Sequence, residues 1–193
     1  FIAYLKYHKN NAYFSKNQKR VEYLFKTWYS NFEMESVFTM KGRYKASDVA
    51  KWFINEIHPE PLKLQKLLYL AQGYSYAFYD EPLFIEDMEA WVHGPVVASV
   101  YHEYRDFSYN PISTTYEVIQ FDDNALEVLN YVKNKYSKYD SKYLEEMTHH
   151  QEPWILGRTG LDPDERSDKT ISKQNIANYF ISDMFQPEDE EWD

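Results

Sequence analysis

Histidine and carboxylate side chains near residue 150 are the first candidates for chemistry in this sequence. His149, His150 and Glu152 lie almost side by side, and His93 and Asp48 could join them in a metal or acid–base site. Neighbouring residues on a helix point about 100° apart, however, so His149 and His150 cannot easily bind one metal ion. The zinc-enzyme spacings His-x-x-x-His and His-Glu-x-x-His do not occur. We therefore expect no metal ligands in this chain.

We expect Thr148 and His149 to end a helix instead, with the imidazole near the helix dipole and hydrogen-bonded to the following turn. Nucleophilic catalysis has less support, because the sequence has no cysteine and its serines lack a Gly-x-Ser-x-Gly or Ser-x-x-Lys context. The segment Gly157–Gly160 lacks the lysine and the spacing of a phosphate-binding loop. We expect no catalytic residue and no cofactor. The alternative is a metal-dependent or acid–base hydrolase in which His149, Glu152 and His93 cluster in an open pocket.

Hydrophobic periodicity predicts the elements that would position these side chains. The pattern indicates a mostly helical domain with short strands, in which a helix from Leu62 to Tyr79 buries one apolar stripe. A polar loop is expected from Gly157 to Lys169. Further helices are expected to begin at Pro95 and Ser141, and others at the N-caps Ser47, Asp122 and Ser172. Short strands are expected within residues 84–92 and 114–121.

The stretch from Glu89 to Tyr101 predicts an abrupt change of direction. Gly94 supplies backbone freedom for a sharp turn, and Pro95 suits the first position of a helix, where a missing N–H costs nothing. The tryptophan before this turn, Trp91, is expected to anchor the core together with Trp52 and Trp154, because aromatic burial dominates such cores.

The composition indicates one globular domain with a large aromatic core. The chain has 193 residues, 44% of them hydrophobic, with 19 Tyr and 12 Phe. The absence of cysteine, of a long apolar run and of a signal-peptide pattern leads us to expect a soluble cytoplasmic protein.

The charge is negative overall and unevenly distributed along the chain. The net charge is −10, yet residues 1–39 carry six Lys or Arg and only three acids. An acidic body argues against binding to nucleic acids, whose phosphates require Lys and Arg. It allows electrostatic steering of a basic partner, although the same charge could simply aid solubility.

Several sequence blocks together resemble the Panacea (SocA-like) antitoxin domain family of bacterial and phage toxin–antitoxin systems, over roughly residues 44–181. The blocks occur in the family's order. They are DVAKWFI at 48–54, LKLQKLLYLAQG at 62–73, EAWVHGPVV at 89–97 with Tyr101, LEEMTHHQEPW at 144–154, and Ile171-Ser172 leading to Tyr179-Phe180. The residues that carry the resemblance, with a structural or partner-binding role, are Lys63, Lys66, Trp91, Gly94, Pro95, Tyr101, Thr148, His149, Pro153 and Trp154.

The resemblance implies an antitoxin that neutralises a cognate toxin, usually encoded beside it, by direct protein–protein binding. Some relatives look like adaptors that deliver the toxin to a protease. Lys63 and Lys66 would then form either ion pairs within the domain or contacts to an acidic partner. A DNA-binding regulator is a further alternative, which the acidic balance disfavours. The identity of the toxin and the oligomeric state stay open.

The resemblance also suggests how the chain is divided. We expect a helical Panacea-like domain at residues 40–186 and an acidic flexible tail at 187–193. Residues 1–39 would be an N-terminal extension, which is either one amphipathic helix that aids partner choice or a non-native leader.

Overall fold

The computed structural model describes residues 44–184, which form a mostly helical fold with one small hairpin. The predicted fold class, mostly helical with short strands, is confirmed. The predicted boundaries near residues 39 and 186 lie outside this part of the chain. Its elements are α3 (Ala46–Ile57), α4 (Pro61–Tyr79), β1 (Glu89–Trp91), β2 (Gly94–Val96), α5 (Ala98–Tyr104), the 3-10 turn η2 (Arg105–Phe107), α6 (Asp123–Tyr136), α7 (Ser141–His149), α8 (Glu152–Gly157) and α9 (Lys173–Asp183).

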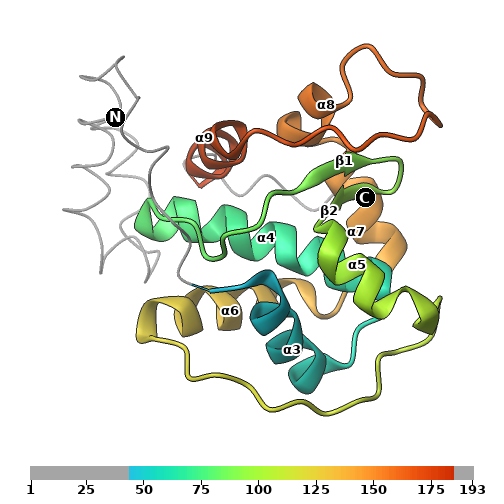
Figure 1. The fold of residues 1–193 in the computed structure, drawn as a ribbon. Helices are drawn as coiled ribbons and strands as arrows, with labels where there is room; N and C mark the ends of the chain where they lie inside the picture. Colours follow the sequence, from blue (N-terminus) through green and yellow to red (C-terminus); the bar gives the residue numbers. More distant parts are fainter. Residues whose placement is uncertain (1–43, 185–193) are drawn as a thin grey trace, which may run out of the picture. The chain divides into compact units, whose positions relative to one another are not determined.

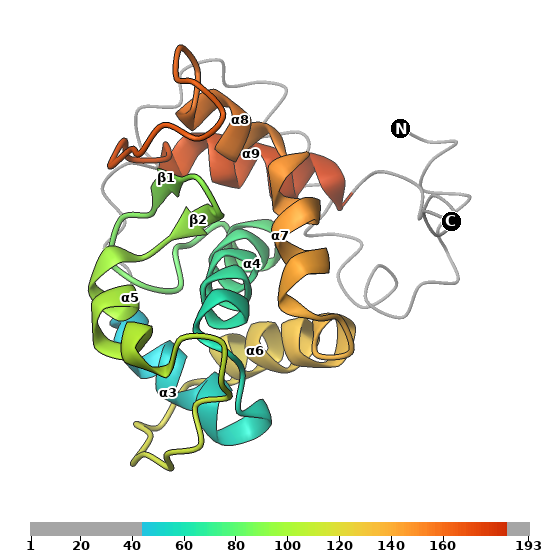
Figure 2. The same ribbon diagram turned by 90° about the vertical axis from the view of Figure 1, so that its right-hand side faces the viewer.

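Helix α4 lies in the middle of these elements. Helices α9, α6 and α7 pack against it most extensively, and α3, α5 and β2 complete its surroundings. Figure 2, which looks nearly along α4, shows the other elements arranged around it. Residues 64–78 of α4 are all buried, so the helix has no solvent-facing side. The sequence predicted burial of one apolar stripe only, but the polar residues between 64 and 78 are buried as well.

Glycine 73 lets α9 approach α4 closely. A Cβ atom at this position would lie 2.2 Å from the ring of Phe180 on α9, a separation that no real Cβ atom tolerates. The Phe180 ring also makes edge contacts with Tyr69 and Tyr74 of α4, with centroids 5.4 and 5.1 Å away. The absence of a side chain at Gly73 and the bulk of the Phe180 ring thus fix the distance between α4 and α9.

The ends of several helices are capped as expected. The carboxylate of Asp122 accepts a hydrogen bond from the Ala125 N–H at the start of α6, and the Ser172 hydroxyl accepts one from Asn175 at the start of α9. The predicted cap at Ser47 is wrong by two residues, because α3 begins at Ala46 and Lys45 is its N-cap.

The prediction of a helix beginning at Pro95 is wrong. Pro95 instead lies in β2 opposite Ala90, and α5 begins three residues later at Ala98. The sharp turn at Gly94 is confirmed, with φ of +96°. The hairpin is closed by Val92 and His93, which link Trp91 to its partner Gly94. The ladder consists of only three residue pairs, so the missing N–H of Pro95 interrupts no extended pairing and the proline is tolerated there.

Two other expectations also fail. Residues 114–121, predicted as a strand, form no ladder with any part of the chain that the structure describes. The short helix α8 was not expected, and it moves the start of the polar loop to Arg158. Within residues 44–184, no helix is long and apolar enough to cross a lipid bilayer.

Candidate functional site

Three buried polar side chains on α4, at Gln65, Lys66 and Gln72, hold backbone groups of the segment that follows the helix. The Gln72 side chain accepts hydrogen bonds from the N–H groups of Leu83 and Phe84, at 3.0 and 3.1 Å, and donates one to the Phe84 carbonyl at 3.2 Å. The Gln65 carbonyl accepts one from the Val97 N–H at 2.8 Å. Sequence reasoning missed both glutamines, because a polar residue in an amphipathic helix looks solvent-facing until the backbone groups that it binds are known.

Lys66 is fully buried between α4 and the hairpin. Its Nζ donates to the Pro95 carbonyl over 3.1 Å, and no salt bridge joins it to a carboxylate in the described part of the chain. Burial lowers the pKa of Lys66 to about 7, although the charge of Glu145 acts in the opposite direction. A side chain in this position cannot reach a partner protein, so the hydrogen bond of Lys66 to Pro95 stabilises the fold.

Gly94 is the residue that makes room for the Lys66 ammonium group. A Cβ atom at this position would lie 2.5 Å from Lys66 Nζ and 2.9 Å from Thr148 Oγ1. Gly94 is thus required for two reasons, its positive φ and the close approach of two side chains from α4 and α7.

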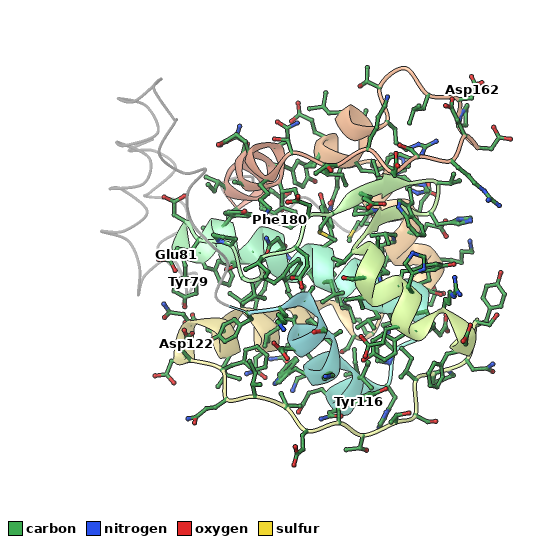
Figure 3. The ribbon with its side chains drawn as sticks, viewed as in Figure 1. Tyr79, Glu81, Tyr116, Asp122, Asp162 and Phe180 are labelled. Carbon is green, nitrogen blue, oxygen red and sulfur yellow. The ribbon has the colours of Figure 1, made fainter. Side chains whose placement is uncertain are left out.

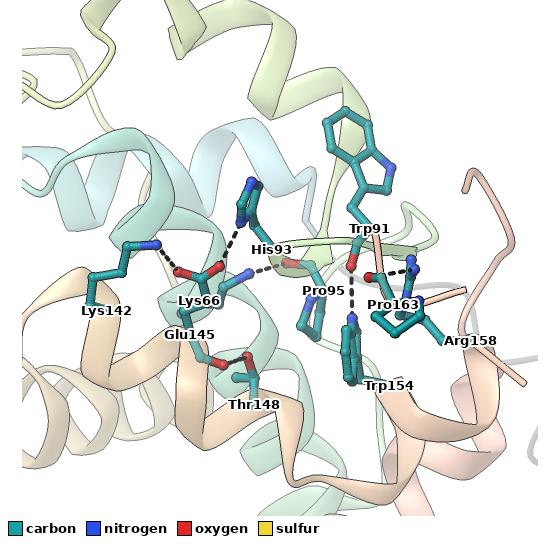
Figure 4. Close-up of polar contacts among 10 residues, drawn as sticks. All are labelled: Lys66, Trp91, His93, Pro95, Lys142, Glu145, Thr148, Trp154, Arg158 and Pro163. Carbon is teal, nitrogen blue, oxygen red and sulfur yellow. Dashed lines mark hydrogen bonds and ion pairs between the residues drawn. The ribbon is translucent and has the colours of Figure 1, made fainter. Parts of the chain in front are cut away.

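Glu145 on α7 lies near the buried lysine and binds two exposed side chains (Figure 4). Its two carboxylate oxygens accept hydrogen bonds from His93 Nδ1 and from Lys142 Nζ, both at 2.6 Å. Burial acts to raise the pKa of Glu145, but these hydrogen bonds and the charges of both partners hold it below its usual value. The carboxyl is therefore an anion that ties α7 to the tip of the hairpin.

The predicted helix end at Thr148 and His149 is confirmed, since α7 ends at His149. The Thr148 hydroxyl donates to the Glu145 carbonyl at 2.8 Å. The expected hydrogen bond from His149 to the following turn is absent. Its ring instead stacks on Trp154 with centroids 4.1 Å apart, and burial lowers its pKa. Among the described residues, His149 Nε2 has no hydrogen-bond partner.

The two tryptophans of the site connect α8 to the hairpin. Trp154 is half-buried and its Nε1 donates to the Trp91 carbonyl at 2.8 Å. Trp91 is also half-buried, because its indole lies against Tyr101 and donates to the Glu89 carboxylate. The expectation that these two tryptophans anchor the core is therefore wrong, whereas Trp52 is buried as expected.

Lys63 and Pro153 lie away from the Lys66 contacts. The Lys63 Nζ donates to the Ser137 carbonyl at 2.7 Å, where α6 ends, and burial lowers its pKa. Pro153 is buried in the first turn of α8, where a proline is well tolerated. Lys63 thus ties α4 to the end of α6.

Arg158 is a further buried residue that sequence reasoning missed. Its guanidinium donates to four backbone carbonyls, of Ala90, Asp162, Pro163 and Glu165, at 2.8–3.1 Å. It also lies 5.5 Å from the centre of the Trp154 ring. One side chain thus fixes the loop after α8 to β1. The guanidinium's planar fork of five donors suits this task. Because α8 was itself not expected, no signal in the sequence marked Arg158.

The residues of the hydrolase hypothesis do not form one open site. His93 is exposed and bonded to Glu145, His149 is stacked on Trp154, and Glu152 is exposed at the start of α8. Among residues 44–184, no group of three or more His, Asp or Glu side chains is placed to hold a metal ion.

Comparison with known proteins gives one match. Residues 64–155 match the family model described as antitoxin SocA-like, Panacea domain. No curated protein and no solved structure matches the chain. The matched segment runs from α4 through α8, so it contains the buried lysine, the hairpin, Glu145 and Trp154. Residues 64–155 therefore match a SocA-like Panacea antitoxin domain, and buried and half-buried contacts within them hold α4, the hairpin, α7 and α8 together.

Proposed function

We propose that this protein is an antitoxin that neutralises a cognate protein toxin by binding to it directly. The observation that carries this proposal is the match of residues 64–155 to the antitoxin family model. Neutralisation of this kind requires a stable interface that covers the toxin's active surface or blocks its target, and it requires no chemistry by the antitoxin.

The geometry of the Lys66 contacts supports a binding role. Lys66, Thr148 and Gln72 are buried and engaged within the domain, so they serve as a scaffold. Contacts to a toxin must come from exposed residues. Large exposed side chains are available for this, among them Tyr109, Tyr143, Ile155 and Leu156. Aromatic side chains contribute strongly to protein interfaces because they bury a large area at little cost in conformational entropy.

The proposal includes a second form, in which the bound toxin is delivered to a protease. Both forms of neutralisation require the same antitoxin–toxin complex, and they differ in whether the bound toxin is then degraded. The net charge of −10 favours a toxin with a basic surface, because opposite charges accelerate encounter.

Co-expression tests the proposal. The protein encoded by the neighbouring gene should arrest growth when it is expressed alone, and co-expression of this chain should restore growth. The two proteins should also co-purify. Growth arrest that this chain does not relieve would contradict the antitoxin function. Repeating the rescue in cells lacking individual proteases separates the two forms, because an adaptor fails to neutralise when its protease is missing.

The N-terminal segment can be tested in the same assay. We expect residues 1–39 to contribute contacts or specificity if they are native. Removing them should then weaken binding to the toxin, and unchanged affinity would contradict this role.

A further inference from the structure

The connection between η2 and α6 contains a segment, residues 113–121, that has the sequence of a strand but no strand partner. Thr, Tyr, Val, Ile and Phe dominate it, and these residue types favour extended structure. In Figure 1 it follows the outer side of α3 on its way to α6. From Tyr116 to Ile119, half-buried and exposed residues alternate, as in an extended chain with one face against the protein. We call this segment the strap.

One edge of the strap is held by α3. The Asn55 side chain donates to the Tyr116 carbonyl at 2.8 Å and accepts from the Tyr116 N–H at 2.9 Å. In an extended chain, the N–H and C=O of one residue point to the same edge, and those of its neighbours point to the opposite edge. The backbone groups of Thr115 and Glu117 therefore point away from Asn55. Figure 3 shows Tyr116 at this outer side of the molecule.

The opposite edge of the strap is open. The backbone groups of Thr115, Glu117 and Ile119 make no hydrogen bond within the described residues, and all three side chains are exposed. Ile119 exposes 46% of its surface. An exposed extended edge of this kind is a ready template for an added strand.

We propose that the strap binds an extended segment of the toxin as an added β-strand, through the backbone groups of Thr115, Glu117 and Ile119. This inference rests on the proposed antitoxin function and specifies where the toxin binds. The charge of the chain around the strap indicates a basic segment, because residues 107–132 contain four acids and no Lys or Arg. A lysine from α3, Lys51, lies 5.9 Å from the centre of the half-buried Tyr116 ring. A second copy of this chain fits less well, since antiparallel self-pairing about Glu117 would place two carboxylates opposite each other.

Proline substitutions test the edge directly. Thr115→Pro and Glu117→Pro each remove an N–H from the open edge, whereas Thr114→Pro removes one from the edge that faces α3. Thr114 is the matched control for Thr115, because it is the same residue type, also exposed and adjacent. All three prolines favour an extended residue before them, so they stiffen the strap alike.

The binding partner in this test is the purified protein encoded by the neighbouring gene. We expect Thr115→Pro and Glu117→Pro to weaken its binding by about tenfold or more, and Thr114→Pro to bind like the wild type. Equal binding by all variants, or equal loss in Thr114→Pro and Thr115→Pro, would overturn the inference while leaving the antitoxin function intact. A wild-type chain that does not bind this protein at all would instead refute the proposed function.

Amide hydrogen exchange provides an independent measurement. Complex formation should slow exchange at Thr115, Glu117 and Ile119, and it should have little effect at Thr114. Amides of the open edge that are already protected in the free chain would overturn the inference. Dimerisation of the free chain that Thr115→Pro abolishes would also overturn it, because the edge would then belong to a second copy.

Discussion

Replacing Gly94 with alanine should destabilise the domain strongly, for two separable reasons. The first is the backbone, because a φ of +96° is rarely adopted by residues with a side chain and costs roughly 1–3 kcal/mol. The second is space, since the new Cβ would lie 2.5 Å from Lys66 Nζ. Lys66 is fully buried and cannot move into solvent, so its ammonium group must leave the Pro95 carbonyl.

The expected loss follows from these two causes. A buried hydrogen bond from a charged donor contributes about 1.5–3 kcal/mol, so the combined cost of Gly94→Ala is about 2.5–6 kcal/mol. The total free energy of unfolding of a domain is typically about 5–15 kcal/mol. Gly94→Ala should therefore remove a large part of the stability, measured by urea unfolding of the full chain with tryptophan fluorescence and circular dichroism.

Gly160 provides a matched control. It also has a positive φ, +81°, but a Cβ atom there would meet no other atom within 4 Å. Gly160→Ala should thus show the backbone cost alone, roughly 1–3 kcal/mol. If Gly94→Ala loses no more stability than Gly160→Ala, the packing of Lys66 against this turn contributes nothing and the reasoning is refuted.

Three further predictions concern the buried polar side chains. Burial lowers the pKa of Lys66 from 10.5 to about 7, so between these pH values the unfolded chain binds a proton that the folded chain has released. The unfolding free energy of the wild type, relative to that of Lys66→Met, should therefore rise between pH 7 and 10 and be flat below pH 7. A pH-independent difference between the two proteins would contradict this. Gln72→Leu should cost about 3–5 kcal/mol in urea unfolding, because it leaves three buried backbone groups at residues 83–84 unpaired; a loss below about 1 kcal/mol would contradict the assigned contacts. Arg158→Lys should make the loop after α8 susceptible to thermolysin near Leu161, since lysine cannot replace the guanidinium fork. The exposed Arg166→Lys is its control, and equal cleavage of both variants would show that Arg158 does not hold the loop.

The sequence predicted the helices well where the signal is local. Asp122 and Ser172 were recognised as caps because a side-chain oxygen placed before an apolar repeat satisfies the first free N–H groups by itself. The central helix was found from its apolar spacing. Its complete burial was not predicted, because Gln65 and Gln72 look like solvent-facing residues until the backbone groups that they bind are known.

The errors occurred where a neighbour in space decides the structure. Pro95 suits either a helix start or the end of a short strand, and pairing of residue 95 with Ala90 selects the strand. The strap has strand-forming residues, yet a strand also requires a partner, which composition cannot supply. Trp91 was assigned to the core on residue type alone, whereas its indole packs on Tyr101 at the surface. Arg158 and Lys66 show the same limit, because their bonding partners are backbone carbonyls that no residue pattern announces.

The burial of residues 64–78 of α4 has a consequence for how such a domain can diversify. Its most demanding contacts, at Lys66, Gln72 and Gly73, all point inward, and none of them depends on what the outer surface carries. Exposed side chains on the strap, α7 and α8 can therefore be exchanged at little expense to folding, because surface substitutions away from caps and buried groups change stability by only about 0.5 kcal/mol. In an antitoxin, this separation would allow the buried contacts to stay the same while exposed side chains are substituted to bind a different toxin.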